Sequence, residues 1–145
     1  MTKHNTYIIN VWTDGSYNAK TKEYGGAYYI EEYDKKGVVV RKDSFSKSQN
    51  VSGECIAVIE ALRYINDNIS DVATVVIHHD YTGLAAWAYG EWQAKSPIGN
   101  WYLSSLSAFS NMDLIFHKVQ AHAGVQQNVL VDRLVAEALG VEGKN

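Results

Sequence analysis

Hydrophobic positions in the first third of the chain alternate with the short period of β-strands. Apolar, β-branched and aromatic runs predict three strands, over residues 7–13, 24–33 and 38–45. The first run stops at Asp14-Gly15-Ser16, and residues 34–37 separate the second run from the third. Both interruptions are typical of turns, so the chain is predicted to open with an antiparallel meander.

The period then changes to that of a helix. A stripe with spacings of three and four residues predicts a helix over residues 52–66, carried by Val58, Ala61, Leu62 and Ile65. Apolar runs predict a buried strand over residues 72–79 and a short strand over 114–119. Helices are predicted over residues 81–92, 101–109 and 128–139, with residues 96–99 as a breaker and Gly140 as the last C-cap.

The order of these elements predicts an α/β fold with a mixed sheet and helices on its faces. The three opening strands are joined by short turns, which favours antiparallel pairing, and the later alternation of strand and helix favours parallel pairing. The chain has no internal repeat, low-complexity tract or linker-like segment. We therefore expect one domain, spanning residues 1–145.

Charge restricts how this chain could bind nucleic acid. The net charge is −3, and it is uneven: residues 1–50 hold eight Lys or Arg against six Asp or Glu, whereas residues 51–145 hold five against ten. Proteins that coat nucleic acid are usually basic. A nucleic-acid site in this chain would therefore be local, or would use metal ions to face the phosphates.

Other features of the composition concern the cellular compartment. A single Cys excludes an internal disulfide, and the sequence has neither a signal peptide nor the ~18 consecutive apolar residues of a membrane span. We expect a soluble, cytoplasmic protein with no membrane partner.

Four carboxylates occupy positions where a purely structural chain would have apolar residues. Asp14 and Asp80 each end an apolar strand, where ligands collect in α/β sheets. Glu54 lies on the apolar stripe of its helix, and Asp132 is surrounded by Val and Leu. An ionised carboxylate near a core costs several kcal/mol unless it is paired or binds a cation.

Each of these acids alone also has a structural explanation, as part of a turn, as a helix cap or as a partner of a helix dipole. The only arginines after residue 41 are Arg63 and Arg133, so four carboxylates have few guanidinium partners. Mg²⁺ is the alternative partner, because it is a hard cation with oxygen ligands. Two such ions about 4 Å apart would suit phosphoryl displacement.

In this pattern the chain resembles a type 1 ribonuclease H over residues 7–139. The resemblance is carried by Thr13-Asp14-Gly15-Ser16, by Gly53-Glu54 at the start of a helix, and by Asp80 after an apolar strand. The most specific stretch is Lys118-Val119-Gln120-Ala121-His122-Ala123-Gly124, followed by Asn128 and Asp132-Arg133-Leu134.

The resemblance implies an endonuclease that cuts the RNA strand of an RNA–DNA hybrid on a five-stranded mixed sheet flanked by helices. Asp14, Glu54, Asp80 and Asp132 would hold two Mg²⁺ ions, with Mn²⁺ as the alternative. Cleavage would leave 5′-phosphate and 3′-hydroxyl ends. His122 would lie on a loop and assist proton transfer or product release, which suits the ordinary pKa of histidine.

The resemblance also assigns contacts to the hybrid. Asn50 would contact the minor groove, where 2′-hydroxyls distinguish RNA from DNA. Trp87 would pack against the DNA strand, and Gly15 and Ser16 would let the backbone approach the RNA. The chain departs from the family pattern after Trp92, where a single lysine stands in place of a basic handle, so it is more similar to a variant branch.

Two other functions remain compatible with the sequence. The same architecture occurs in transposases, integrases and structure-specific exonucleases, because a fold alone does not fix function. A non-enzymatic hybrid-binding module with a degenerate site is the second, although all four acids are present. We expect a monomer whose partner is an RNA–DNA hybrid.

Overall fold

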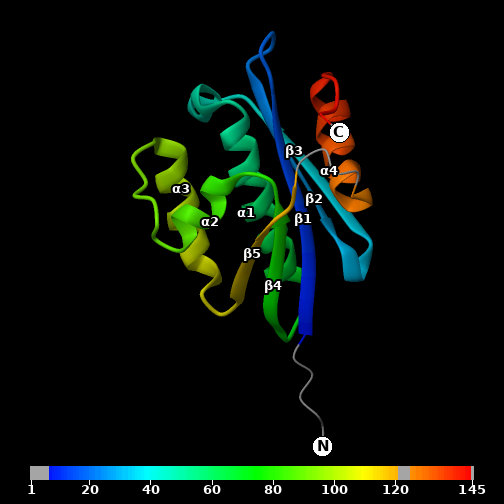
Figure 1. Ribbon diagram of the computed structural model, residues 1–145, viewed down its shortest axis with the longest axis vertical. Coiled ribbons are helices and arrows are strands. Elements are labelled where there is room, and N and C mark those ends of the chain that lie inside the picture. Colours follow the sequence, from blue (N-terminus) through cyan, green and yellow to red (C-terminus); the bar gives the residue numbers. More distant parts are fainter. Residues whose placement is uncertain (1–6, 121–124, 145) are drawn as a thin grey trace, which may run out of the picture.

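A five-stranded mixed sheet runs through the centre of the protein (Figure 1). The computed structural model describes residues 7–120 and 125–144. The strands are β1 (Tyr7–Asn18), β2 (Glu23–Ile30), β3 (Lys35–Arg41), β4 (Val72–His79) and β5 (Asp113–Lys118), in the order β3-β2-β1-β4-β5. β1, β2 and β3 pair antiparallel, and β4 pairs parallel with both β1 and β5. This confirms the predicted mixed sheet.

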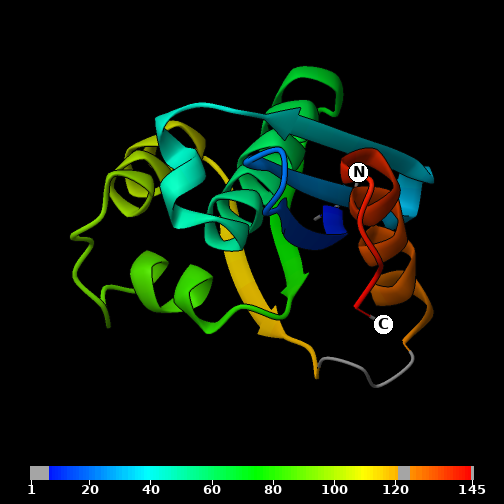
Figure 2. The same cartoon turned by 90° about the horizontal axis from the view of Figure 1, so that it is seen from above.

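Helices cover both faces of the sheet. They are α1 (Asn50–Asn68), α2 (Thr82–Ala88), α3 (Pro97–Leu106) and α4 (Gln126–Leu139). α1, α2 and α3 lie on one face and α4 lies alone on the other (Figures 1 and 2). Within the described ranges, no helix is long and apolar enough to cross a membrane.

The two faces of the sheet bury separate apolar clusters. The stripe predicted from Val58, Leu62 and Ile65 is fully buried between α1 and the sheet. Under α4, Trp12 of β1 packs in a second cluster with Val131, Val135 and Leu139. β1 therefore has apolar packing on both faces, which makes it the central strand of the fold.

The first predicted strand boundary is wrong. β1 continues through Asp14, Gly15 and Ser16, which pair with Ala27, Gly26 and Gly25 of β2. Asp-Gly-Ser is typical of a turn in isolation, but here a glycine-rich partner strand provides a complete antiparallel ladder. The tertiary pairing overrides the local preference.

The predicted turn at residues 34–37 is also wrong. A 3₁₀ turn, Glu31–Tyr33, follows β2, and Asp34 ends it in the left-handed conformation with φ 48°. Aspartate tolerates that conformation better than most residues do. Residues 35–37 therefore already belong to β3. β3 ends at Arg41, before Asp43 caps the 3₁₀ turn Ser44–Ser48.

Residues 96–99 start a helix rather than break one. The Ser96 hydroxyl accepts a hydrogen bond from the Gly99 amide at 3.1 Å, and Pro97 occupies the first turn of α3. Proline is well suited to that position because its missing N–H would have no intrahelical partner there. α2 is shorter than the helix predicted over residues 81–92 and ends at Ala88. Gly140 ends α4 with φ 72°, as predicted.

Glycine at two positions lets α1 lie directly on the backbone of the sheet. A Cβ on Gly53 would overlap the carbonyl oxygen of Gly25, and a Cβ on Gly15 would overlap the backbone nitrogen of Glu54. Side chains at either position would push the first turns of α1 away from β1 and β2. These contacts fix where Glu54 lies relative to Asp14.

We predict that Gly53→Ala lowers the free energy of unfolding by about 1–3 kcal/mol or more, because the new methyl group must displace backbone atoms. Denaturant unfolding monitored by circular dichroism measures this change. The matched control is Gly99→Ala, whose Cβ would come no closer than 3.1 Å to a serine hydroxyl. A Gly53→Ala protein as stable as this control would contradict the proposed contact.

Candidate metal centre

The sheet register brings Asp14 and Asp80 to the same level on neighbouring strands. β1 and β4 are parallel and pair Trp12 with His78, so each aspartate stands two residues beyond that pair. Asp14 is still within β1, whereas Asp80 directly follows the end of β4. Ligand sites form at the carboxyl ends of parallel strands.

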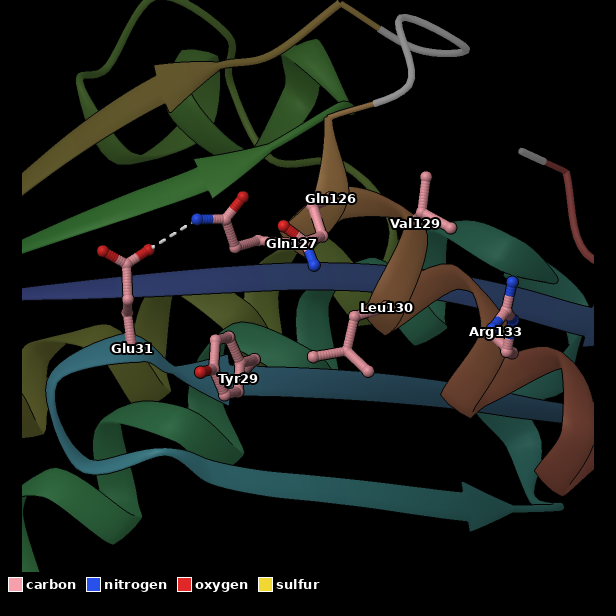
Figure 3. Close-up of a pocket in the computed structure, with 7 residues that line it drawn as sticks. All are labelled: Tyr29, Glu31, Gln126, Gln127, Val129, Leu130 and Arg133. Carbon is pink, nitrogen blue, oxygen red and sulfur yellow. Dashed lines mark hydrogen bonds between the residues drawn. The ribbon is translucent and has the colours of Figure 1, made fainter.

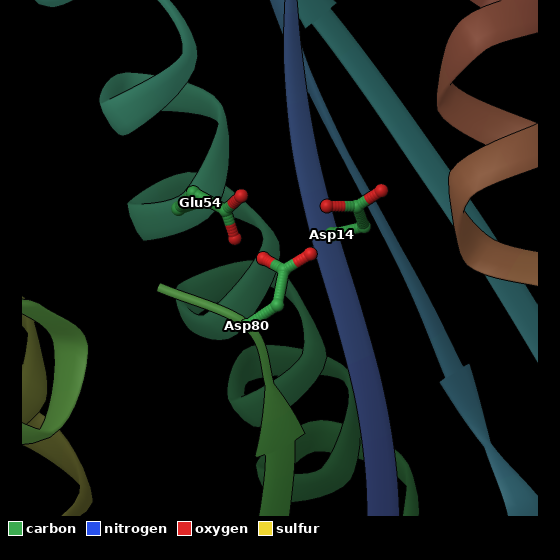
Figure 4. A group of neighbouring side chains, drawn as sticks. All are labelled: Asp14, Glu54 and Asp80. Carbon is green, nitrogen blue, oxygen red and sulfur yellow. The ribbon is translucent and has the colours of Figure 1, made fainter. Parts of the chain in front are cut away.

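The first turns of α1 add a third carboxylate. Gly15 and Gly53 let the helix backbone contact β1, and this contact holds Glu54 beside the sheet. Figure 4 shows Asp14, Glu54 and Asp80 converging from β1, α1 and the end of β4. One oxygen atom from each of the three carboxylates lies within 4.8 Å of the other two.

Two of the three carboxylates in this group, which we call the acidic cluster (Asp14, Glu54 and Asp80), are deeply buried. The exposed fraction is 0% for Asp14 and 2% for Glu54, and Asp80 is half-buried. Asp14 Oδ1 accepts a hydrogen bond from the Gly15 amide at 2.9 Å. Within the described part of the chain, Asp14 Oδ2 and Glu54 Oε1 have no hydrogen-bond partner.

Asp132 lies next to the acidic cluster but is not one of the carboxylates within 4.8 Å. It is 2% exposed in α4, and its charge helps to raise the pKa of Asp14. The segment after α4 links the two aspartates. The Lys144 amide donates to Asp132 Oδ1 at 3.0 Å, and the Lys144 ammonium lies 3.3 Å from Asp14 Oδ1.

Burial and repulsion from neighbouring carboxylates make Asp14 and Glu54 reluctant to ionise. Burial raises the pKa of Asp14 to about 7, with further increases from Asp80 and Asp132 and an opposing decrease from Lys144. The pKa of Glu54 is raised well above its usual value by burial and then by Asp14 and Asp80. Such perturbed carboxyls are typical of functional sites.

These residues fit a hard divalent cation. All the donors are carboxylate oxygens, which Mg²⁺ and Mn²⁺ prefer over nitrogen or sulfur ligands. Buried oxygens on Asp14 and Glu54 lack a hydrogen-bond partner within the described residues. A divalent ion would provide both the missing ligand contacts and the missing positive charge.

The predicted substrate-binding residues lie in different environments. Asn50 is exposed at the start of α1, four residues before Glu54. Ser16 is buried in β1. The absence of a side chain at Gly15 is explained by its contact with the backbone of α1. These positions border the acidic cluster through β1 and α1.

Trp87 is an interior residue of α2. It is 9% exposed, and its ring lies 6.1 Å from the rings of Tyr81, Trp92 and Tyr102. Trp92 is 46% exposed and stands in the segment between α2 and α3, which contains neither helix nor strand over residues 89–96. Sequence analysis therefore missed Trp92 as the more accessible of the two indoles.

His122 lies outside the described residues. Lys144, which contacts two of the four predicted acids, was missed because no hydrophobic pattern or motif marks it.

A separate cavity of 590 Å³ lies on the α4 side of the sheet (Figure 3). Its lining combines Tyr29 and Glu31 with residues of α4, and Gln127 Nε2 donates to Glu31 Oε1 at 3.0 Å. None of the predicted site residues lines it. The cavity therefore does not form part of the acidic cluster.

Comparisons with known proteins match most of the chain. A family model described as RNase H matches residues 6–140. A ribonuclease H of Treponema denticola is 30% identical over 155 residues, which covers 90% of this chain and 96% of the relative.

Solved structures show the same fold at lower identity. RNase H1 of Halobacterium salinarum NRC-1 has a TM-score of 0.70 at 17% identity, covering 92% of this chain and 98% of the other. LC11-RNase H1, solved in complex with an RNA/DNA hybrid, has a TM-score of 0.74 at 18% identity, covering 91% and 96%.

We predict that the metal-free protein loses stability as the pH rises from about 4 to about 7. The Asp14 carboxyl has a pKa of about 7 in the folded protein and about 3.8 in the unfolded chain, so between these values folding takes up a proton. A shift of this size corresponds to about 4 kcal/mol.

Chemical unfolding in EDTA at several pH values measures this loss. Asp14→Asn should flatten the pH dependence, whereas Asp67→Asn, a control on the exposed surface of α1, should not. Equal pH slopes for wild type and Asp14→Asn would show that Asp14 ionises normally.

Proposed function

The chain belongs to the ribonuclease H family, and from that premise we propose that it hydrolyses the RNA strand of RNA–DNA hybrids with the help of divalent cations. The observation that carries the proposal is the acidic cluster. Its carboxylates lie side by side, those of Asp14 and Glu54 are buried, and among the described residues the ion pair to the cluster comes from Lys144 alone. The hybrid bound to LC11-RNase H1, a protein of the same fold, supports this substrate class.

Asp14, Glu54 and Asp80 would hold the ions, and Asp132 would complete the set from α4. Two Mg²⁺ ions, or Mn²⁺ in their place, would supply the charge that activates water and stabilises the leaving 3′-oxygen, so that 5′-phosphate and 3′-hydroxyl ends result. The ions would also reduce the electrostatic repulsion between this acidic protein and its polyanionic substrate.

The chain's own contribution is to fix the carboxylates before the substrate arrives. Asp14 is held in the central strand, and Glu54 is held by backbone contact between α1 and β1. Because both side chains are almost fully buried within these elements, we expect little reorganisation during the reaction. Preorganised charge of this kind is usually the largest contribution to catalysis.

Substrate contacts would surround this centre. Asn50 is exposed and close in sequence to Glu54, so its amide would reach the minor groove and read 2′-hydroxyls. Gly15 and Ser16 would lie next to the RNA backbone. Trp87 would act by supporting the exposed ring of Trp92, which is available to stack on the DNA strand. We further propose a monomeric, cytoplasmic protein with one domain over residues 1–145.

The proposed activity is tested with end-labelled RNA presented as an RNA–DNA hybrid, as duplex RNA, as single-stranded RNA and as a chimera with one ribonucleotide. Each substrate is incubated with Mg²⁺, with Mn²⁺ and with EDTA. We expect cleavage of the hybrid only, abolished by EDTA. Cleavage of the duplex or single-stranded RNA at an equal rate, or no cleavage of the hybrid with either ion, would contradict the proposal.

We predict that Asp14→Asn reduces the cleavage rate by about 10²-fold or more, since several kcal/mol of charge stabilisation depend on the bound ions. Single-turnover assays measure the rate, and fluorescence anisotropy measures hybrid binding, which we expect to persist. Asp67→Asn is the matched control. Retention of cleavage by Asp14→Asn would remove Asp14 from the site.

A smaller effect is expected for His122→Ala. The proposed role of His122 in proton transfer or product release suits the ordinary pKa of histidine, and His122 would assist the reaction without holding the ions. We predict a loss in turnover well below that of Asp14→Asn, measured under steady-state conditions. An equal loss would indicate that His122 has a different role.

A further inference from the structure

The segment after α4 places a positive charge next to Asp14 of the acidic cluster. Gly140 and Val141 end the helix, and Val141 donates to the Ala136 carbonyl at 3.0 Å. From there the chain crosses to β1. The Lys144 ammonium donates to the Gly15 carbonyl at 2.7 Å and lies 3.3 Å from Asp14 Oδ1.

The backbone of the same segment contacts Asp132, the fourth predicted acid. The Lys144 amide donates to Asp132 Oδ1 at 3.0 Å, and a Cβ on Gly143 would come within 2.8 Å of Asp132 Oδ2. Residues 143–144 therefore contact Asp132 through the backbone and Asp14 through a side chain. Two of the four carboxylates that would bind metal are engaged by one short segment.

Lysine is an incomplete substitute for a divalent ion at this position. Its single charge lies beside three clustered carboxylates, and within the described residues Asp14 Oδ2 and Glu54 Oε1 keep no hydrogen-bond partner. The Lys144 side chain is also 40% exposed, whereas the Asp14 side chain is fully buried. The ammonium can therefore leave toward solvent without disturbing the core.

We propose that residues 141–144 form an internal plug, in which the Lys144 ammonium occupies the cation position at Asp14 and must leave before a divalent ion binds there. This inference rests on the proposed function, because it takes the acidic cluster to be a metal centre. In the metal-free protein the plug stabilises the buried carboxylates. In the metal-bound protein it is displaced, which makes ion binding weaker than the cluster alone would allow.

Isothermal titration calorimetry of the intact chain with Mg²⁺ and with Mn²⁺ tests the plug. We expect Lys144→Gln to lower the Kd for the ion by about five- to tenfold, since it removes one competing charge at close range. Lys36→Gln is the matched control, because it removes the same charge from an exposed position on the edge strand β3. Its Kd should match that of the wild type.

Thermal unfolding provides a second measurement that does not depend on activity. In EDTA, Lys144→Gln should melt below the wild type, because the cluster has lost its counter-charge. In saturating Mg²⁺ the two proteins should melt together, so the metal-induced rise in Tm is larger for the variant.

The outcomes separate this inference from the proposed function. If the wild type binds metal and cleaves hybrid but Lys144→Gln binds the ion no more tightly, the plug is wrong and the proposed function stands. If neither protein binds a divalent ion, both the plug and the metal centre are wrong.

Discussion

Repulsion between buried carboxylates is the constraint on which the rest of this structure depends. Asp14 and Glu54 come from different elements, yet both are almost inaccessible to water. One carboxylate oxygen from each lies within 4.8 Å of the other and of an Asp80 oxygen. Burying such a group is unfavourable, since each ionised carboxylate loses its hydration. Packing at the level of the backbone makes it possible: β1 is buried on both faces, and glycines seat α1 directly on the sheet.

Much of this arrangement follows from the sequence. The stripe of α1 and the apolar run of β4 identify the elements, and Asp14 and Asp80 each follow an apolar run, which marks them as candidates for a site. Those features are local, and so a pattern along the chain reveals them. The mixed topology also follows, because strand order and connection length favour antiparallel and then parallel pairing.

The features that could not be predicted from the sequence depend on contacts between residues far apart in the chain. The Asp14-Gly15-Ser16 turn was predicted wrongly because its glycine-rich partner strand, β2, completes a ladder that no local preference contains. Lys144 contacts Asp14 across 130 positions, and no periodic signal connects residues so far apart. The surroundings of Trp87 also depend on other parts of the chain: its ring lies inside an aromatic group whose exposed member is Trp92, and its contact with the DNA strand stays a prediction.

The most direct test of the central claim, that the buried carboxylates form a divalent cation site, is anomalous X-ray diffraction from crystals soaked in Mn²⁺. We expect anomalous density among Asp14, Glu54 and Asp80, with the Lys144 ammonium withdrawn from Asp14. Crystals that take up Mn²⁺ only elsewhere on the surface, with the Lys144 contact intact, would contradict the claim.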